Sequence, residues 1–557
     1  MDVESVSRRN LLAITGAGVV ALGLAGCGSG GGNKSLTQSL GPVSNVKAAP
    51  PGPGNVSHGR KGGSVVTAWP QEANSYDAAL GYDLHSWDAV CCLLYTPLYL
   101  FDGKTGGPAP AAALAMPKVS ADGKNYVIQL RPDFKFHNGR RIVAADYVYA
   151  LTRVLDPSLE SWASSYLLGI KGAKAFYAGK SKDVSGLIAR DDYTLEINLE
   201  DRDVTFASVL CQPYTSALPA EEVKKLGKAF SRTPVGNGPF QIVSYDSKAR
   251  TAVFKASPNF PWAGLPFLDK VEYRWGIDAS LQFLQLQKGD VDILGEGLTP
   301  SMAARVQSNR GLRTKYAVTI PLLGLSWASI NVSSPKLKDL RVRQALNWAT
   351  DRDQLARQSH GLQSPWGSCL PKEQAEYKRT AKPYTLDVKR AKALLAEAGV
   401  GSLTLEFICP DEGYWKSASQ ILQQQWSKIG VNLKITTLNG SAFWDAAEKS
   451  KGDLFGQHWY QVQPSGLDII STNFVTNAAS NYSGYSNPKV DALVARATAT
   501  RTLAESNKIL AGAEELISED APGVFIGGLN FTAMRAPRVR NYQYRGETGT
   551  YYNRLWV

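Results

Sequence analysis

A run of ten uncharged residues near the C-terminal end, Gln457–Gly466, carries side chains that are well suited to ligand binding. It places His458, Trp459 and Tyr460 beside Gln461. Aromatic rings stack on flat ligand groups and amides donate and accept hydrogen bonds, so these residue types favour recognition. The run fits either a core strand that ends in a turn or one wall of a ligand cleft.

Motifs for catalysis are missing from the sequence. It contains no Gly-x-x-x-x-Gly-Lys-Ser/Thr phosphate loop, no His-Glu-x-x-His and no Gly-x-Ser-x-Gly. Its five histidines lack the helical spacing of a metal site. A catalytic pair of carboxylates stays open, because such pairs come from distant positions. We therefore expect no enzyme activity, no cofactor and no metal.

The first 27 residues predict export and lipid attachment. Arg8-Arg9 precede a mostly apolar run from Leu11 to Gly26, which is typical of a secretory signal and resembles the twin-arginine type. The run is shorter than the roughly 20 residues of a spanning helix. Leu24-Ala25-Gly26-Cys27 resembles the bacterial lipobox, in which the cysteine is lipid-modified. We expect a signal peptide at 1–27 and an extracytoplasmic body anchored to the cell membrane through Cys27; an uncleaved anchor is the alternative.

The rest of the chain predicts a tether followed by a large folded body. Residues 28–61 are rich in Gly, Ser, Pro and Asn and cannot bury a core. The remaining residues, about 495, are too many for one core and indicate two or three domains. The net charge of +12 is scattered among acids, which favours a solvated basic surface over nucleic-acid binding.

The cysteines leave their pairing open. With Cys27 lipidated, an odd number remains, so at least one thiol stays outside any internal disulfide. The exported compartment permits disulfides. The candidates are Cys91, Cys92, Cys211, Cys369 and Cys409.

Hydrophobic periodicity predicts a mixed α/β body. Apolar residues at i, i+3, i+4 and i+7 predict a helix over 341–349, and residues 63–69 resemble an opening strand. Residues 403–408, 414–429 and 431–438 predict a strand–helix–strand unit with parallel strands. Leu281, Leu284 and Leu286 are expected to lie along an amphipathic helix that helps to build the core.

Ordered motifs from about Gly62 to Val557 resemble the extracytoplasmic solute-binding proteins of ABC importers, in the peptide/nickel family (family 5), and the oligopeptide-binding proteins among them. Gly236, Gly238 and Pro239 in one motif predict a rigid turn with unusual dihedrals. The motifs are Phe136-His137-Asn138-Gly139, Ala145–Ala150 through to Asp156-Pro157, Pro234–Phe240, Pro258-Asn259-Phe260, Pro266–Val271, Leu286–Ile293, Ile330-Asn331, Asp339–Leu346, Asp351-Arg352, Tyr485–Pro488 and Val490-Asp491.

The resemblance implies an α/β fold of the two-lobed periplasmic-binding-protein kind, type II in its large three-domain form. A hinge would close the lobes on a ligand held in the cleft between them. The implied divisions are 62–80 with 218–322 and 525–557 for lobe I, 81–217 for an inserted domain, and 323–524 for lobe II.

The resemblance also implies which residues line the cleft. In oligopeptide-binding relatives the segment that matches Gln457–Gly466 pairs with the ligand as an added strand. Core packing is the alternative for each aromatic residue. The implied ligand-binding set is Asn74, Ser75, Tyr76, Trp162, Tyr414, Trp415, Trp459, Tyr460, Gln461, Val462 and Asp468.

Val462 departs from the family pattern. Peptide-binding relatives carry Trp-x-Ala-Asp-Tyr-Pro here, and their aspartate anchors the peptide amine, whereas an ungapped alignment places Val462 at that position. Valine cannot hold an ammonium group. Asp468 replaces the missing anchor, or the amine stays in water, or the ligand is an oligosaccharide or another non-peptide solute stacked on aromatic rings. Nickel is disfavoured by the few histidines, and haem stays open.

The expected function is that of a lipid-anchored monomer that captures peptides or related solutes for an ABC permease and its ATPase subunits. The same fold acting without a permease is one alternative. A lipid-anchored hydrolase is a more remote one, because it needs a nucleophile or a carboxylate pair in the cleft.

Overall fold

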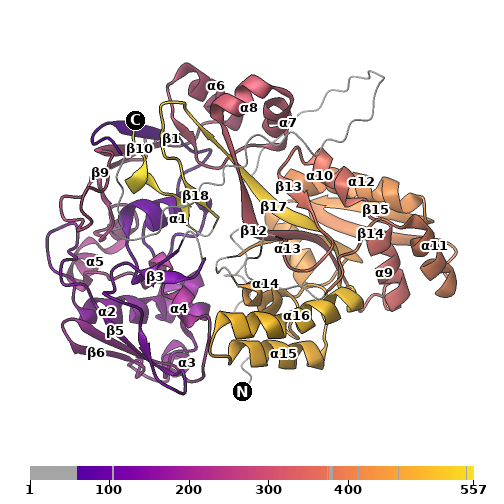
Figure 1. The fold of residues 1–557 in the computed structure, drawn as a ribbon, viewed down its shortest axis with the longest axis horizontal. Coiled ribbons are helices and arrows are strands. Elements are labelled where there is room, and N and C mark those ends of the chain that lie inside the picture. The colour runs from indigo at the N-terminus through magenta and orange to yellow at the C-terminus, as the bar shows by residue number, and fades with distance from the viewer. Residues whose placement is uncertain are drawn as a thin grey trace.

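The computed structural model describes residues 59–102, 106–372, 374, 381–411, 413–461, 463, 465–478, 480–546 and 548–557. The expected signal peptide with Cys27, most of the expected tether, and Val462 lie outside these residues. Two lobes stand side by side, joined by the long strands β12 and β17 (Figure 1).

The strands follow the predicted mixed pattern. In chain order they are β1 (Ser64–Ala68), β2 (Tyr99–Phe101), β3 (Pro108–Pro110), β4 (Lys118–Val119), β5 (Asn125–Gln129), β6 (Leu187–Asp191), β7 (Thr194–Asn198), β8 (Phe240–Asp246), β9 (Thr251–Ala256), β10 (Lys270–Arg274), β11 (Ile293–Leu294), β12 (Ala317–Ile330), β13 (Gln363–Pro365), β14 (Leu403–Pro410), β15 (Val431–Leu438), β16 (Leu454–Tyr460), β17 (Gly523–Arg535), β18 (Tyr544–Arg545) and β19 (Gly549–Thr550).

The helices alternate with these strands, and most are short. The α-helices are α1 (Leu84–Ala89), α2 (Ala144–Val154), α3 (Ala173–Tyr177), α4 (Phe206–Val209), α5 (Ala220–Leu226), α6 (Ala279–Lys288), α7 (Pro300–Ser308), α8 (Arg310–Tyr316), α9 (Leu340–Trp348), α10 (Arg352–Gln358), α11 (Val388–Glu397), α12 (Gly413–Ser427), α13 (Gly440–Glu448), α14 (Gly466–Asn473), α15 (Pro488–Thr498) and α16 (Leu503–Asp520). The π-helix is η3 (Val90–Leu94), and the 3₁₀ turns are η4 (Pro157–Leu159), η5 (Trp162–Leu167), η6 (Pro213–Thr215), η7 (Gly227–Ser231) and η8 (Tyr552–Arg554).

One large sheet runs through both lobes in the order β15-β14-β16-β12-β17-β11-β1-β10-β9-β8, and β13 pairs with β17 at its side. The predicted strand–helix–strand unit is confirmed. β14 and β15 are parallel from Leu403 opposite Val431 to Pro410 opposite Leu438, and α12 connects them. The opening strand and the helix predicted over 341–349 are confirmed as β1 and α9.

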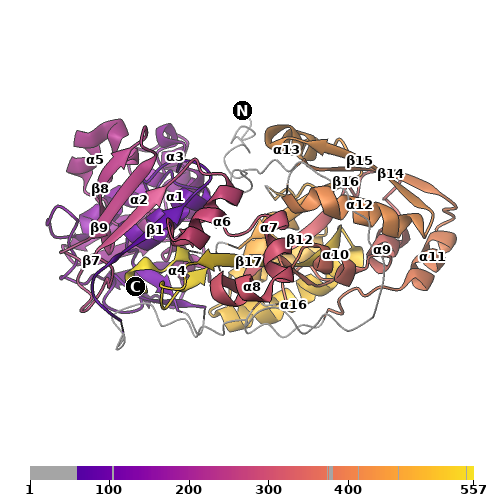
Figure 2. The same cartoon turned by 90° about the horizontal axis from the view of Figure 1, so that it is seen from above.

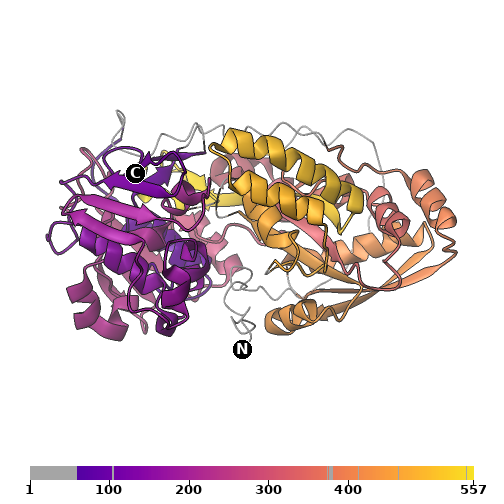
Figure 3. The ribbon, with the colours of Figure 1, turned by 90° about the horizontal axis from the view of Figure 1, so that it is seen from below.

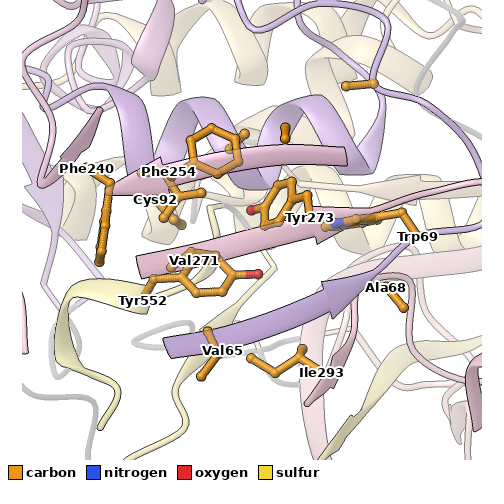
Figure 4. Packing of buried hydrophobic residues seen from close by; sticks show 14 of the residues in the cluster. Val65, Ala68, Trp69, Cys92, Phe240, Phe254, Val271, Tyr273, Ile293 and Tyr552 are labelled. Carbon is orange, nitrogen blue, oxygen red and sulfur yellow. The ribbon is translucent and has the colours of Figure 1, made fainter. Parts of the chain in front are cut away.

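The core of lobe I packs on β1, β10, β9 and β8 (Figure 4). A carboxylate is buried inside it: Asp88 accepts hydrogen bonds from Tyr273 Oη at 2.6 Å and Tyr552 Oη at 2.8 Å. Burial raises the pKa of Asp88 to about 6, although these donors act against the shift. The segment before β1 also contacts this lobe, because Lys61 Nζ donates a hydrogen bond to the Pro266 carbonyl at 2.8 Å.

A second core lies below it and belongs to the inserted segment, around the small sheet β4-β5-β7-β6. Its buried residues run from Ala79 and Leu98 to Ala217, with Phe260–Phe267 added from outside the insertion. Residues 89–95 of α1 and η3 pack in the lobe I core instead. α1 and η3, which lie within the expected insertion 81–217, therefore contribute to the lobe I core.

In lobe II the sheet is covered on both faces. Trp327 and Phe525 pack against α14, α15 and α16, whereas their neighbours Ala328 and Val524 pack against α9, α11 and α12. Successive strand residues point to opposite faces, so both faces are apolar. Figure 2 shows α9, α11 and α12 in lobe II, and Figure 3 shows α15 and α16 along one side of it.

The two crossing strands carry an irregularity between the lobes. Pro321 of β12 lies opposite Asn530 of β17, but the next pair is Leu325 with Gly528. Residues 322–324 therefore bulge against a single residue of β17. Bulges bend strands locally, and this one stands where the packing of β17 changes from the lobe II cores to the lobe I core.

The motifs behind the family resemblance meet in space as scaffold. His137 N donates to the Gly236 carbonyl at 2.8 Å, and Asn259 Nδ2 donates to the His137 carbonyl at 3.1 Å. We expected unusual dihedrals at Gly236 and Gly238, but neither residue has a positive φ. A Cβ at either position would lie within 2.3 Å of a backbone carbonyl oxygen of η3, so close approach is what requires glycine there.

The expected core role of α6 is only partly correct. Leu286 is buried, but Leu281 and Leu284 are 48% and 47% exposed. Phe283 and Gln282 take the inward face in their place. Among the described residues, no helix is both long and apolar enough to cross a membrane.

Candidate functional site

α1 and η3 of lobe I are largely buried. Along these eleven residues only Leu84, Trp87 and Cys91 retain exposed surface, and the others are buried. Their spacing of three and four residues places them on one side of the helix. This stripe is the only part of α1 and η3 that a ligand can reach.

Trp87 belongs to a group of four rings, the aromatic box, formed with Trp162, Tyr166 and Tyr214. The Trp162 ring lies 5.6 Å from Trp87, 6.2 Å from Tyr166 and 5.5 Å from Tyr214, each edge to face. Tyr166 and Tyr214 stack at 6.0 Å. The box joins α1 to η5 and η6 of the inserted segment, and Trp162 and Tyr166 are half-buried.

Asp468 approaches the box from lobe II. It lies in the first turn of α14, is 8% exposed, and accepts a hydrogen bond from Trp459 Nε1 at 3.0 Å. Burial raises the pKa of both Tyr166 and Tyr214, and the negative charge of Asp468 raises them further. The carboxylate of one lobe therefore acts electrostatically on the rings of the other.

A direct contact beside this place holds the lobes together. Val204 N of the inserted segment donates to the carbonyl of Thr498 at the end of α15, at 3.0 Å. The Val204 side chain packs against the lobe II core that contains α14, α15 and α16. The aromatic box and Asp468 therefore belong to one inter-lobe site.

The end of β16 forms the hinge side of this site. Gln461 N donates to the carbonyl of Leu323 in the bulge at 2.8 Å. Tyr460 is 38% exposed, so solvent reaches part of its ring. Burial lowers the pKa of His458, the ring that meets Tyr460 edge on at 5.5 Å, to about 4. The exposed Tyr460 ring is therefore a part of this strand end that a ligand can reach.

Two carboxylates of lobe I, Glu296 and Asp83, influence each other through their charges. Glu296 follows β11, and Asp83 caps the N-terminus of α1. Burial raises the pKa of Glu296 to about 7, and the nearby charge of Asp83 adds to the shift. Sequence reasoning did not single out either residue, because neither belongs to a motif.

The predicted site residues differ in exposure and in their place in the fold. Trp162, Trp459, Tyr460 and Asp468 lie at the inter-lobe site. Gln461 is buried beside them, and its Nε2 donates to Gln374 Oε1 at 2.9 Å.

The first predicted segment is scaffold. Tyr76 has no exposed surface, and its hydroxyl meets His85 Nε2 at 3.2 Å inside the lobe I core. Ser75 is also buried, and Asn74, which is exposed, accepts from Ser86 Oγ at 2.8 Å to hold the loop before α1. The side chain of Tyr76 is thus a core residue and no part of a cleft wall.

The two predicted residues of α12 differ from each other. Trp415 is 2% exposed in the lobe II core, where its ring packs under Gly456, so it is core as well. Tyr414 is half-buried, and its hydroxyl has no hydrogen-bond partner among the described residues. It follows β14, whose end lies on the same sheet edge as the end of β16.

Trp87, Tyr166 and Tyr214 were missed by sequence reasoning. Trp162 and Tyr166 are one helical turn apart, which is a weak signal that they share a face. No local pattern connects them with Tyr214, because that contact spans about fifty residues of chain.

A separate polar pocket of about 540 Å³ lies at the opposite end of β16. Its Asp453 accepts from Lys336 Nζ at 2.8 Å and from Ser334 Oγ at 2.6 Å. The protein's own side chains thus satisfy its main charge, and we do not assign a ligand to it.

Metal and disulfide chemistry were tested on the described residues. They contain no cluster of three or more His, Cys, Asp or Glu side chains that could hold a metal ion. None of the five cysteines left open by the sequence forms a disulfide. Burial raises the pKa of Cys91, the one with exposed surface, well above its usual value.

Comparison with known proteins assigns the fold and the family. The chain is 27% identical over 443 residues to the probable deoxycholate-binding periplasmic protein YgiS of Escherichia coli K12, covering 77% of this chain and 81% of that protein. It is 26% identical over 466 residues to the dipeptide-binding protein of the same strain, covering 79% and 84%.

The periplasmic murein tripeptide-binding protein MppA in its unliganded open form matches the structure with a TM-score of 0.76 at 22% identity. The match covers 89% of this chain and 97% of that one. The expected two-lobed α/β architecture of type II is thereby confirmed. Residues 107–481 match the family described as bacterial extracellular solute-binding proteins, family 5 Middle, and the chain belongs to this family.

Proposed function

We propose that this protein is a lipid-anchored substrate-binding protein of an ABC importer, and that it captures peptides whose free amine binds Asp468. One observation carries the proposal: a buried carboxylate, held by Trp459, lies close enough to Tyr166 and Tyr214 of the opposite lobe for its charge to raise their pKa. A carboxylate flanked by aromatic faces suits an ammonium group, because both the charge and the ring quadrupoles attract it.

In this proposal Asp468 takes the role of the family's anchoring aspartate, whose position is occupied by Val462 in this sequence. The family's anchoring position is Val462 in the sequence, whereas Asp468 is six residues further along the chain, in α14. Trp459 belongs to the strand and donates to this carboxylate, so the motif tryptophan and the new acid form one unit. The dipeptide-binding relative supports the peptide assignment.

The proposed domain division explains how the protein would open and close around its ligand. The proposed lobe I, the proposed insertion over 81–217 and the proposed lobe II would each be built around a buried cluster of their own. Opening and closing would rotate lobe II about the bulge at 322–324 and move Asp468 away from the box and back toward it. The protein would act as a monomer, carry lipid on Cys27 and deliver its ligand to a permease.

A non-peptide solute is the second candidate. The four rings of the aromatic box, and the uncharged Val462 at the family's anchoring position, favour a flat or ring-shaped ligand, and one relative is named for binding deoxycholate.

Mass spectrometry of the protein's own ligand tests the choice. The full chain is purified from cells without refolding and then denatured, and the released small molecules are measured. We expect a ladder of peptide masses. A hexose-spaced series or one discrete metabolite would overturn the peptide assignment.

Lipid attachment is tested separately. Replacing Cys27 with Ser should move the protein from the membrane fraction to the soluble extracytoplasmic fraction. Replacing Cys91 with Ser is the matched control and should leave the protein at the membrane.

A further inference from the structure

Two hydrogen-bond donors of the aromatic box are left without acceptors. The indole nitrogen of Trp162 and the hydroxyl of Tyr214 are both buried, and neither finds an acceptor among the described residues. Tyr214 is only 3% exposed. Buried donors are nearly always paired, so two in contacting rings indicate a place prepared for an acceptor from outside the protein.

The backbone fixes where these donors lie. Ser161 Oγ donates to the Ala79 carbonyl at 2.6 Å and caps η5 by accepting from Ala163 N. This holds the turn that begins at Trp162, and the Trp162 ring meets Tyr214 edge on at 5.5 Å. Both donors are therefore held in place before any ligand arrives.

The acceptor-only group of lobe II faces the same place. Val204 ties the inserted segment to the end of α15 at 3.0 Å, and α14, which carries Asp468, packs in the same lobe II core as α15. A carboxylate accepts hydrogen bonds, whereas the indole N–H and the phenol O–H donate. The site is therefore complementary to a ligand that carries a cationic group and an oxygen acceptor close together.

This pair of demands selects a ligand group. An alkylamine or a quaternary ammonium group brings the cation without the oxygen. A neutral sugar brings oxygens without the cation. An α-aminoacyl group brings both, because one carbon separates its ammonium from its carbonyl.

We propose that Trp162 and Tyr214 form an oxygen subsite that receives the first carbonyl oxygen of a bound peptide. This inference rests on the proposed function and adds the group that the inserted segment recognises. The subsite is completed only when the lobes meet, so it couples recognition of the peptide N-terminus to closure.

The test uses two pools of mixed-sequence tripeptides, one ordinary and one with sulfur in place of the first carbonyl oxygen. Sulfur keeps the amine and the shape but is a weaker acceptor. Native mass spectrometry measures occupancy of the full chain and of the variants Trp162→Phe and Tyr214→Phe, which each lose one donor. Tyr384→Phe is the control, since Tyr384 Oη donates to the Ser518 carbonyl in lobe II, away from the box.

For the wild type and Tyr384→Phe we expect the sulfur pool to bind about fivefold to tenfold more weakly than the ordinary pool. In Trp162→Phe and Tyr214→Phe this difference should be smaller than in the wild type, because one of the two donors to the oxygen is gone. Equal binding of both pools to the wild type would overturn the oxygen subsite and leave peptide binding intact. Binding of neither pool would overturn the proposed function, and the inference with it.

Discussion

Trp459 and Asp468 are joined by a 3.0 Å hydrogen bond from the indole nitrogen to the carboxylate. The bond links the end of β16 to the first turn of α14, across a loop whose Gln461 is tied to the hinge bulge. A shift of the hinge side would therefore be transmitted to the position of the carboxylate that faces the opposite lobe.

Replacing Asp468 with Asn should weaken the binding of free-amine peptides by about tenfold to a hundredfold, because a charge-assisted hydrogen bond is lost. The amide can still accept from Trp459, so the fold should persist. Titration calorimetry with tripeptides and their N-acetylated forms checks this, since the acetylated forms should not distinguish the variant from the wild type. Asp445→Asn, at an exposed ion pair with Lys449, is the control. Unchanged affinity for free amines would contradict the assignment.

Replacing Val204 with Asp should hinder closure, because it places a charge against the apolar lobe II core that the side chain now touches. Small-angle scattering should show a larger radius of gyration at a given ligand concentration, and the apparent dissociation constant should rise about tenfold. Val243→Asp, at an exposed valine of β8, should change neither quantity. A compact Val204→Asp protein with wild-type affinity would show that the contact is incidental.

Glu296 predicts a particular pH dependence of stability. Its pKa is raised to about 7, mainly by burial and then by Asp83, so the folded state holds the proton more tightly than the unfolded state. The contribution of Glu296 to the free energy of unfolding therefore decreases as pH rises from about 4.5 to 7, and it does not change further above pH 7. Glu296→Gln should be more stable than the wild type by about 1–2 kcal/mol at pH 8, with the gap closing near pH 4.5.

Urea unfolding of the variant and the wild type over this pH range checks the prediction. The histidines His85, His137 and His458 have pKa values lowered to about 4 by burial, and they act in the opposite sense, removing stability as pH falls from 6.5. The variant retains them, so the difference between the two proteins isolates Glu296. Glu397→Gln, on the exposed side of α11, should show no gap at any pH.

Asn237 should matter for stability and leave binding unchanged. Its side chain accepts a hydrogen bond from Thr96 N at 2.9 Å and donates one to the Thr96 carbonyl at 2.8 Å. The amide thus satisfies both backbone groups of Thr96, as a neighbouring strand would. Asn237→Ala leaves both backbone groups buried without partners and should cost about 2–4 kcal/mol of unfolding free energy. Thermal unfolding measures this, and an unchanged melting temperature would show that the motif is not scaffold.

The sequence by itself determined the local elements and the family. Apolar periodicity placed α9, β14, α12 and β15 within a few residues, because helix and strand periods depend on neighbours in the chain. The ordered motifs were sufficient for the family, since they encode the turns and contacts that build the scaffold.

Only the tertiary structure decided which aromatic residues keep exposed surface and which are buried in the core. Tyr76 and Trp415 looked like ligand-facing residues, yet Tyr76 packs against β8 and β9 and Trp415 packs against β16. Leu281 and Leu284 had the spacing of a buried stripe, yet both side chains are nearly half exposed. A pattern shows that residues share a face, and only the packing of distant segments decides whether that face is covered.

The site follows the same rule. Trp162, Tyr214 and Asp468 come from stretches separated by up to about three hundred residues, and no spacing in the sequence connects them. They come together because the insertion rests on α15 beside the hinge strands. The sequence supplied the chemistry of these side chains, and the fold decided that they face each other.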